Sequence, residues 1–301
     1  MEALRHLIIT GSSGFLGGEI AARARTFCPA LRVTALPSPR VGGIDLTDTR
    51  ATDRLAADVP LDDPGGTALI HAAAVIQVGP ETPALDPSTN KTSANETMAA
   101  RLAEWAEFAG IGFSVMVSSV SVYTPLPGRT AVGGATQPVT AYGRDKLNAE
   151  RVWQQSLPAE NSAVVRLAGV WGWQRRPTLF WNRLLLTAAR GSPPEPTPVV
   201  LRKRSVRNYI SAAEASDALI HLSRNRMAGT FLMAGQNSID TASFVDALQK
   251  LPGSRLFVDW RDDGDRDECL YSCSSEIAPW VSPFEDVLSA TWAAKPEWVL
   301  E

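Results

Sequence analysis

The sequence predicts an α/β fold in which a doubly wound parallel sheet is joined by a smaller C-terminal lobe. In the first half, short apolar runs alternate with segments of helical character, as in sheets covered by helices on both faces. After Gly169 this alternation changes, and a proline-rich piece, Ser192–Pro198, follows. We therefore expect a first domain over 1–168 and a lobe over 169–301, with some later segments returning to the first domain.

The expected elements follow from apolar runs and their spacing. We expect strands at Leu7–Ile9, Arg32–Leu36, Ala68–Ala73, Phe113–Val117 and Ala163–Leu167. Helices are expected at Phe15–Phe27, from about Thr49, at Ser93–Phe108 and at Tyr142–Gln155. In the second part we expect a helix at Ala212–Ser223, a strand at Thr230–Met233 and a helix at Ala242–Leu251.

Composition excludes several classes of protein. With 301 residues, 45% hydrophobic and 20% charged, the chain can bury a large core and is not expected to be disordered. A net charge of -3 without a long basic run argues against nucleic acid as a partner. There is neither an apolar run of about 20 residues nor a signal-peptide pattern, so we expect a cytoplasmic protein that binds no membrane. Three cysteines and three histidines favour reduced thiols and no metal site.

Three spaced glycines, Gly11, Gly14 and Gly17, lie between the first strand and the first helix. In this context they permit a tight turn, close approach of the backbone to a pyrophosphate, and close packing of helix on strand. The helix start adds free N–H groups and a positive dipole end. The pattern predicts a dinucleotide site in a Rossmann-type domain, although a purely structural turn also explains it. Within the turn, we expect Ser13, Phe15 and Leu16 to contact the cofactor.

The end of the second strand indicates which dinucleotide is bound. NAD sites usually have an acid here that accepts hydrogen bonds from the ribose 2′-hydroxyl. This chain has no carboxylate between Leu36 and Arg40, and Arg40 is suited to a 2′-phosphate. We therefore expect NADP; NAD is the alternative if Arg40 is only a solvated loop residue.

Tyr142 and Lys146 lie four residues apart and share one face of a predicted helix. A free tyrosine has a pKa near 10 and is a poor acid or base at neutral pH, and a nearby ammonium lowers that pKa. Ser119, at the end of a strand, is suited to donate a hydrogen bond to a substrate oxygen. Each feature alone is common on protein surfaces, but together with the glycine turn they predict hydride transfer.

In these motifs the chain resembles the extended short-chain dehydrogenases/reductases of the NAD-dependent epimerase/dehydratase kind. The resemblance covers nearly all of the first 175 residues, in the order Thr10–Gly17, Asp45–Asp48, His71–Ala74, Asn95–Thr97, Ser118–Tyr123, Tyr142–Lys146 and Arg166–Gly172.

The resemblance implies roles for individual residues. Asp45 and Leu46 would contact the adenine, the backbone of Ala72 and Ala73 would pass beside the cofactor, and Asn95 would support the site. Ser119, Tyr142 and Lys146 would be catalytic, and Lys146 would also hold the nicotinamide ribose. A homodimer is a further implication.

The substrate is less well defined. Val206–Ile210 is similar to the family segment whose arginine binds the diphosphate of a nucleotide sugar, which implies this role for Arg207 with help from Asn182; a solvated basic cluster is the alternative. Ser121 and Trp171 are further candidates for substrate contact, although packing in the core is the alternative for Trp171. Gly169 stands where sugar-nucleotide members often carry an asparagine, so one polar contact is missing or moved.

The residues after Ser119 indicate which reaction types are expected. Sugar 4,6-dehydratases of the family carry an acidic pair where this chain has Val120 and Ser121, so elimination of water lacks its acid and base. We expect an NADP(H)-dependent ketoreductase or epimerase acting on a nucleotide-activated sugar or similar polar ketone. Two alternatives stay open: a reductase or dehydrogenase of a small apolar ketone or aldehyde, and a catalytically idle dinucleotide-binding protein.

Overall fold

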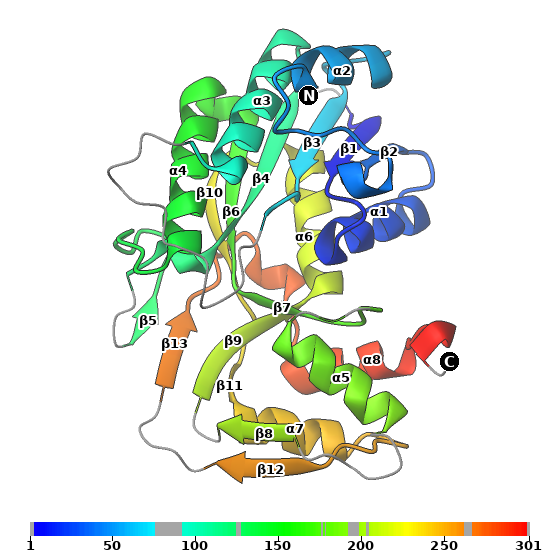
Figure 1. Cartoon of the computed structure of the whole chain (residues 1–301), viewed down its shortest axis with the longest axis vertical. Helices are drawn as coiled ribbons and strands as arrows, with labels where there is room; N and C mark the ends of the chain where they lie inside the picture. Colours follow the sequence, from blue (N-terminus) through cyan, green and yellow to red (C-terminus); the bar gives the residue numbers. More distant parts are fainter. Residues whose placement is uncertain are drawn as a thin grey trace. The chain divides into compact units, whose positions relative to one another are not determined.

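A computed structural model describes residues 3–75, 92–124, 128–175, 177, 179–191, 199–202, 205–261 and 267–299 (Figure 1). The chain divides into two compact units. The first comprises 1–125, 132–167 and 215–232, and the second comprises 126–131, 168–214 and 233–301.

The first unit is built on a six-stranded sheet with the order β10-β6-β4-β3-β1-β2. Its central strands are apolar and buried along nearly their whole length, as expected for strands covered on both faces. The pairs β1–β2, β1–β3, β3–β4 and β4–β6 are all parallel. The strands are β1 (His6–Thr10), β2 (Arg32–Leu36), β3 (Thr67–His71), β4 (Phe113–Ser119), β6 (Ser162–Leu167) and β10 (Gly229–Met233).

Helices cover both faces of this sheet (Figure 1). One core cluster joins strand residues to α2, α3 and α4. On the other side, α1 and α6 are joined by an ion pair between Arg23 and Asp217. The doubly wound arrangement is therefore confirmed. The helices are α1 (Phe15–Phe27), α2 (Ala51–Asp58), α3 (Ala94–Phe108), α4 (Ala141–Ser156) and α6 (Ala212–Asn225).

In its described residues, the second unit contains two smaller sheets and the three α-helices α5, α7 and α8. One sheet has the order β11-β9-β13-β5, with β7 paired to β9, and the other pairs β12 with β8. An aromatic core centred on Trp181 and Phe244 holds the helices against the strands. The strands are β5 (Arg129–Thr130), β7 (Gly169–Trp171), β8 (Val199–Arg202), β9 (Ser205–Ser211), β11 (Ser238–Asp240), β12 (Val258–Arg261) and β13 (Asp267–Tyr271). The helices are α5 (Phe180–Arg190), α7 (Thr241–Gln249) and α8 (Phe284–Ala293).

Some expectations need correction. The predicted strand at Thr230–Met233, assigned to the lobe, is β10 and lies in the large sheet, and the preceding helix α6 also belongs mainly to the first unit. Helices α5 and α8 and strands β8, β9, β12 and β13 were not predicted. The proline-rich piece lies outside the described residues, and the boundary at 168/169 stays a prediction. No described helix has the length and apolar character needed to cross a bilayer.

Candidate active site in the first unit

The glycine turn leaves no room for side chains. Gly11 has φ +72°, and a Cβ there would lie 2.7 Å from the backbone nitrogen and Cα of Ala73. A Cβ on Gly17 would lie 2.3 Å from the Gly11 carbonyl oxygen. Both distances are far below van der Waals contact, so the turn, the first helix and the end of β3 approach each other as only glycine allows.

The N-terminus of α1 is open to an anion. Its N-cap is Gly14, which offers no side chain, and its first turn contains no acid. Within the described residues, no side chain caps its backbone N–H groups, and these groups with the helix dipole attract phosphate. Phe15 and Leu16, the first two helical residues, are half-buried. The glycine turn, here called the glycine cradle, and the uncapped N-terminus of α1 together fit the pyrophosphate of a dinucleotide.

Ser13 lies in the turn but faces the loop after β2. Its hydroxyl accepts a hydrogen bond from the Ser38 N–H at 3.0 Å, and the Ser12 N–H donates to the Leu36 carbonyl at 3.2 Å. Arg40 lies in the short 3₁₀ helix Pro39–Val41 that follows and is exposed. The structure thus ties the glycine turn to the loop that carries Arg40.

Asp45 and Leu46, the two residues expected at the adenine, are held in different ways. The Asp45 carboxylate accepts hydrogen bonds from the Thr47 N–H at 2.9 Å and hydroxyl at 2.7 Å, and these bonds lower the pKa of Asp45. Leu46 is 7% exposed and packs in the core beneath α2 and α3. Its side chain is therefore occupied, which leaves its backbone for an adenine contact.

The carboxyl end of β3 is held by side chains of the sheet. Thr10 Oγ1 accepts a hydrogen bond from the Ala73 N–H at 3.3 Å and lies 2.9 Å from His71 Nδ1. Burial, with the nearby charge of Lys146, lowers the pKa of His71 to about 3, so the ring is neutral. Ala72 and Ala73 pass directly beside Gly11, so the structure brings these predicted cofactor residues together.

Ser119 and Tyr142 meet at the carboxyl end of β4. The Ser119 hydroxyl accepts from the Ser121 N–H and donates to the Ser121 hydroxyl, both at 3.1 Å. Its proximity to the Tyr142 side chain lowers the pKa of that phenol in part. The strand end and the start of α4 therefore place two hydroxyls and a phenol in one cluster.

Lys146 lies one turn along α4 from Tyr142 and is only 2% exposed. Its Nζ donates to the Val117 carbonyl at 2.7 Å. Burial lowers the pKa of Lys146 to about 8, although the negative charges of Asp145 and Glu150 raise it in part. The ammonium is thus held against β4.

The expected effect of Lys146 on Tyr142 is not seen. Burial raises the pKa of Tyr142, the proximity of Ser119 lowers it in part, and the charge of Asp145 raises it further. Lys146 directs its ammonium to the Val117 carbonyl, so desolvation outweighs any stabilisation of the phenolate. The Tyr142 phenol is therefore protonated at neutral pH.

Asn95 and Asp145 form a polar cluster beside this pair. The Asn95 amide is 2% exposed, and its oxygen accepts from the Val75 N–H at 2.8 Å. Its nitrogen donates to the Val75 carbonyl at 2.9 Å and to the Asp145 carboxylate at 2.5 Å. Sequence reasoning placed Asn95 here but overlooked Asp145, although it lies within the Tyr142–Lys146 segment.

A buried ion pair behind the site was also overlooked. The Glu150 carboxylate, 1% exposed, pairs with Arg166 at 2.8 Å and accepts from the Ser118 hydroxyl at 2.5 Å. Arg166 also donates to the Tyr123 hydroxyl at 3.2 Å and lies over its ring. This network joins α4 and the end of β4, which bear the catalytic candidates, to the end of β6.

Three of the residues expected at the substrate, Trp171, Asn182 and Arg207, lie in the second unit, whereas Ser119, Ser121 and Tyr142 lie in the first. Arg207, on β9, is half-buried and donates to the Val206 carbonyl at 2.8 Å. The Asn182 amide is 1% exposed, accepts from the Gly172 N–H and donates to Gln174, both at 3.0 Å. Both of its polar groups are thus used within the unit, so the structure favours a supporting role over substrate contact.

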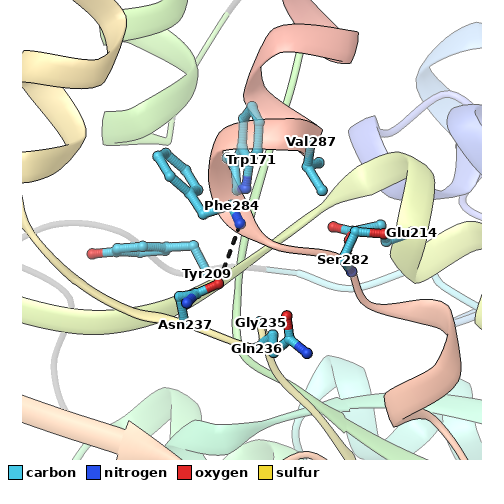
Figure 2. A pocket seen from close by; sticks show the side chains of 9 residues that line it. All are labelled: Trp171, Tyr209, Glu214, Gly235, Gln236, Asn237, Ser282, Phe284 and Val287. Carbon is cyan, nitrogen blue, oxygen red and sulfur yellow. Dashed lines mark hydrogen bonds between the residues drawn. The ribbon is translucent and has the colours of Figure 1, made fainter.

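Trp171 is 1% exposed and packs against Phe244 and Phe284 in the aromatic core. Its ring lines a small pocket with Tyr209, Glu214 and Asn237 (Figure 2). Two polar side chains of this pocket are paired: Glu214 accepts from the Ser282 N–H at 2.8 Å, and Asn237 accepts from the Phe284 N–H at 3.3 Å. These hydrogen bonds hold the start of α8 in place. For Trp171 the structure favours a role in core packing.

Comparison with known proteins identifies the family. The sequence matches the RmlD substrate binding domain family over residues 5–253. No curated protein is similar enough in sequence to match.

Similar solved structures cover nearly the whole chain. The dTDP-4-dehydrorhamnose reductase of Bacillus anthracis in complex with NADP is 14% identical, with a TM-score of 0.75 over 98% of this chain and 100% of that one. The UDP-glucose 4-epimerase of Thermus thermophilus in complex with NAD is 19% identical, with a TM-score of 0.72 over 96% and 98%. The UDP-glucuronic acid 4-epimerase of Bacillus cereus in complex with NAD is 17% identical, with a TM-score of 0.72 over 96% and 97%.

At these identities the likeness shows a shared fold, while the family match spans most of the sequence. The resemblance to extended short-chain dehydrogenases/reductases is thereby confirmed. This chain belongs to the RmlD substrate binding domain family.

Proposed function

We propose that the protein is an NADP(H)-dependent oxidoreductase that reduces a keto group of a nucleotide-activated sugar or a similar polar ketone. One observation carries the proposal: Ser119 is close enough to the Tyr142 side chain to lower its pKa, and buried Lys146 lies one helical turn away, in the unit that also holds the glycine turn. The alternative outcome of the same chemistry is epimerisation through a transient ketone.

The chain's own residues handle the proton. A nicotinamide dinucleotide, when bound, supplies the hydride. Tyr142 gives its proton to the substrate oxygen, and the Ser119 hydroxyl donates a hydrogen bond to that same oxygen as charge develops on it. Lys146 would hold a ribose hydroxyl of the dinucleotide, and its ammonium would offset the charge that forms on the phenolate once the proton has left.

The substrate class is supported by two observations. Arg207 offers a planar guanidinium that suits a diphosphate. The similar structures are named for enzymes of nucleotide sugars, including a dTDP-4-dehydrorhamnose reductase and a UDP-glucose 4-epimerase. A cytoplasmic location and a homodimer stay predictions.

The first test measures the oxidation of NADPH by the loss of its absorbance, with nucleotide-linked keto sugars and simple ketones as candidate substrates. Tyr142→Phe should lower kcat by a factor of about 10² or more, because the proton donor is lost. Tyr271→Phe on β13 is the matched control and should retain activity. If wild type and Tyr142→Phe are equally inert while both bind NADPH, the protein is an idle dinucleotide binder.

Two arginine variants test the ligands separately. Arg40→Ala should weaken NADPH about tenfold and leave NADH nearly unchanged, with exposed Arg50→Ala as control. Equal losses for both cofactors would reject the 2′-phosphate role. Arg207→Ala should raise KM for the nucleotide-linked substrate without affecting NADPH, whereas exposed Arg183→Ala should not. An unchanged KM would favour a small apolar ketone.

A further inference from the structure

Gly143 lies in the first turn of α4, directly after Tyr142, and is buried. Glycine is a poorer helix former than alanine, so a glycine inside a helix is expected where another group approaches closely. A Cβ on Gly143 would lie 2.1 Å from the Ser121 carbonyl oxygen and 2.8 Å from Pro138 Cβ. The helix backbone therefore lies against the backbone of the 3₁₀ turn Val120–Val122, at a distance that only glycine allows.

The backbone of Ser121 also holds Ser119. While the Ser121 carbonyl faces Gly143, the Ser121 N–H donates to the Ser119 hydroxyl oxygen at 3.1 Å. Since this bond uses the Ser119 oxygen as an acceptor, the Ser119 proton can turn from the Ser121 hydroxyl to a substrate oxygen. One residue thus connects Ser119 with the neighbour of Tyr142.

Further along, α4 is fixed to β4 by side chains. Lys146 Nζ donates to the Val117 carbonyl at 2.7 Å, one helical turn beyond Tyr142. One turn later, the Glu150 carboxylate accepts from the Ser118 hydroxyl at 2.5 Å. The body of the helix is held by these contacts, so a substitution in the first turn acts mainly on that turn.

We propose that Gly143 is a positioning residue, whose missing side chain lets the first turn of α4 lie on the Ser121 carbonyl. This contact sets the separation between the Tyr142 phenol and the Ser119 hydroxyl. The role rests on the proposed function, in which both groups act on the same substrate oxygen. A misplacement of about 1 Å in such a pair can cost a factor of about 10² in rate.

Gly143→Ala is the direct test. The added Cβ would have to retreat from 2.1 Å to the 3.4 Å at which ordinary van der Waals contact begins, which displaces the first turn by about 1 Å. We expect kcat for reduction to fall by a factor of about 10², with the dissociation constant of NADPH changed less than about threefold. The matched control is exposed Gly133→Ala, whose Cβ would meet nothing within 4 Å and which should retain activity.

A second comparison separates positioning from a general defect of the fold. In the Tyr142→Phe background the phenol is absent, so Gly143→Ala should lower the remaining kcat less than about threefold. A defect of the fold would instead lower kcat by the same factor in both backgrounds.

Crystal structures of wild type and Gly143→Ala give a readout that needs no substrate. The distance between Tyr142 Oη and Ser119 Oγ should be longer by about 1 Å in the variant.

A milder variant tests the same turn if Gly143→Ala does not fold. Thr140 is the N-cap of α4, and its hydroxyl accepts from the Gly143 N–H at 3.0 Å. Thr140→Val removes this acceptor and should lower kcat about fivefold by loosening the first turn. Thr140→Ser keeps the acceptor and should retain activity.

The outcomes separate the two proposals. An unchanged kcat in the variant that perturbs the turn, an unchanged distance between the two hydroxyls, or an equal loss in the Tyr142→Phe background overturns the role of Gly143. A longer distance in a protein that reduces no substrate supports the positioning role but rejects the proposed function.

Discussion

Replacing Lys146 by methionine should make the protein more stable at neutral pH while abolishing its activity. Lys146 is 2% exposed, and burial lowers its pKa from 10.5 to about 8. Methionine is similarly long, unbranched and a good helix former, so it can fill the same space on α4.

The sign follows from comparing the folded and unfolded states. Because the folded pKa lies below the unfolded one, charged Lys146 destabilises the fold, fully so below about pH 8. This cost disappears as the pH rises toward 10.5. At about 1.4 kcal/mol per pKa unit, the cost is about 3 kcal/mol at pH 7 and about 1.5 kcal/mol at pH 9.5. Loss of the bond to the Val117 carbonyl offsets about 1–2 kcal/mol of the gain.

Urea unfolding of wild type and Lys146→Met at pH 7 and pH 9.5 measures this directly. We expect the variant to be more stable by about 1–2 kcal/mol at pH 7, with the difference shrinking by about 2 kcal/mol at pH 9.5. Exposed Lys250→Met on the loop after α7 is the control for the substitution itself, and it should change the stability at pH 7 by less than about 1 kcal/mol.

The reasoning is refuted if the variant is less stable at pH 7, or if its difference from wild type is the same at both pH values. In the first case the ammonium is better stabilised by its neighbours than burial implies. In the second case Lys146 titrates alike in the folded and unfolded chains.

Three further changes follow from the packing. Gly17→Ala, whose Cβ would lie 2.3 Å from a backbone oxygen, should weaken NADPH binding at least about tenfold and lower the melting temperature. The control Gly18→Ala, whose Cβ would lie 3.1 Å from its nearest neighbour, should have a much smaller effect. Equal effects of the two changes would contradict the role of Gly17 in the glycine turn. Glu150→Gln should cost about 3 kcal/mol in unfolding free energy, because it leaves the half-buried Arg166 guanidinium without its anionic partner. Adding Arg166→Met should recover part of this loss, and no recovery would argue against the pairing. Asn182→Ala should cost about 1–2 kcal/mol and leave KM unchanged; a raised KM would instead support substrate contact.

The sequence was sufficient to predict much of the first unit. Helix α1 and strand β2 have the predicted bounds, because a glycine turn and continuous apolar strands are strong local signals. The second unit was predicted poorly, because its short strands carry weak alternation. Helix α5 is different: Trp181, Leu184, Leu185 and Ala188 form a helical stripe that the sequence contained and the prediction overlooked.

For the site, spacing predicted which residues share α4 but not what each one faces. The contact of Lys146 with the Val117 carbonyl, and the cluster of Asp145 with Ser93 and Asn95, join residues about 29 to 52 positions apart. Such contacts depend on how α3 and α4 pack on the sheet. The direction of the Tyr142 pKa was therefore beyond spacing arguments, because it is decided by burial.

The hydrogen bonds from Ser38 to Ser13 and from Ser12 to Leu36 have a practical consequence for redesign. These bonds connect the loop after β2, which would distinguish a ribose 2′-hydroxyl from a 2′-phosphate, directly to the glycine turn that would bind the pyrophosphate. An attempt to exchange cofactor preference by grafting a different loop after β2 would also disturb the cradle. Single side-chain changes that keep the Ser38 N–H in place would be the better strategy.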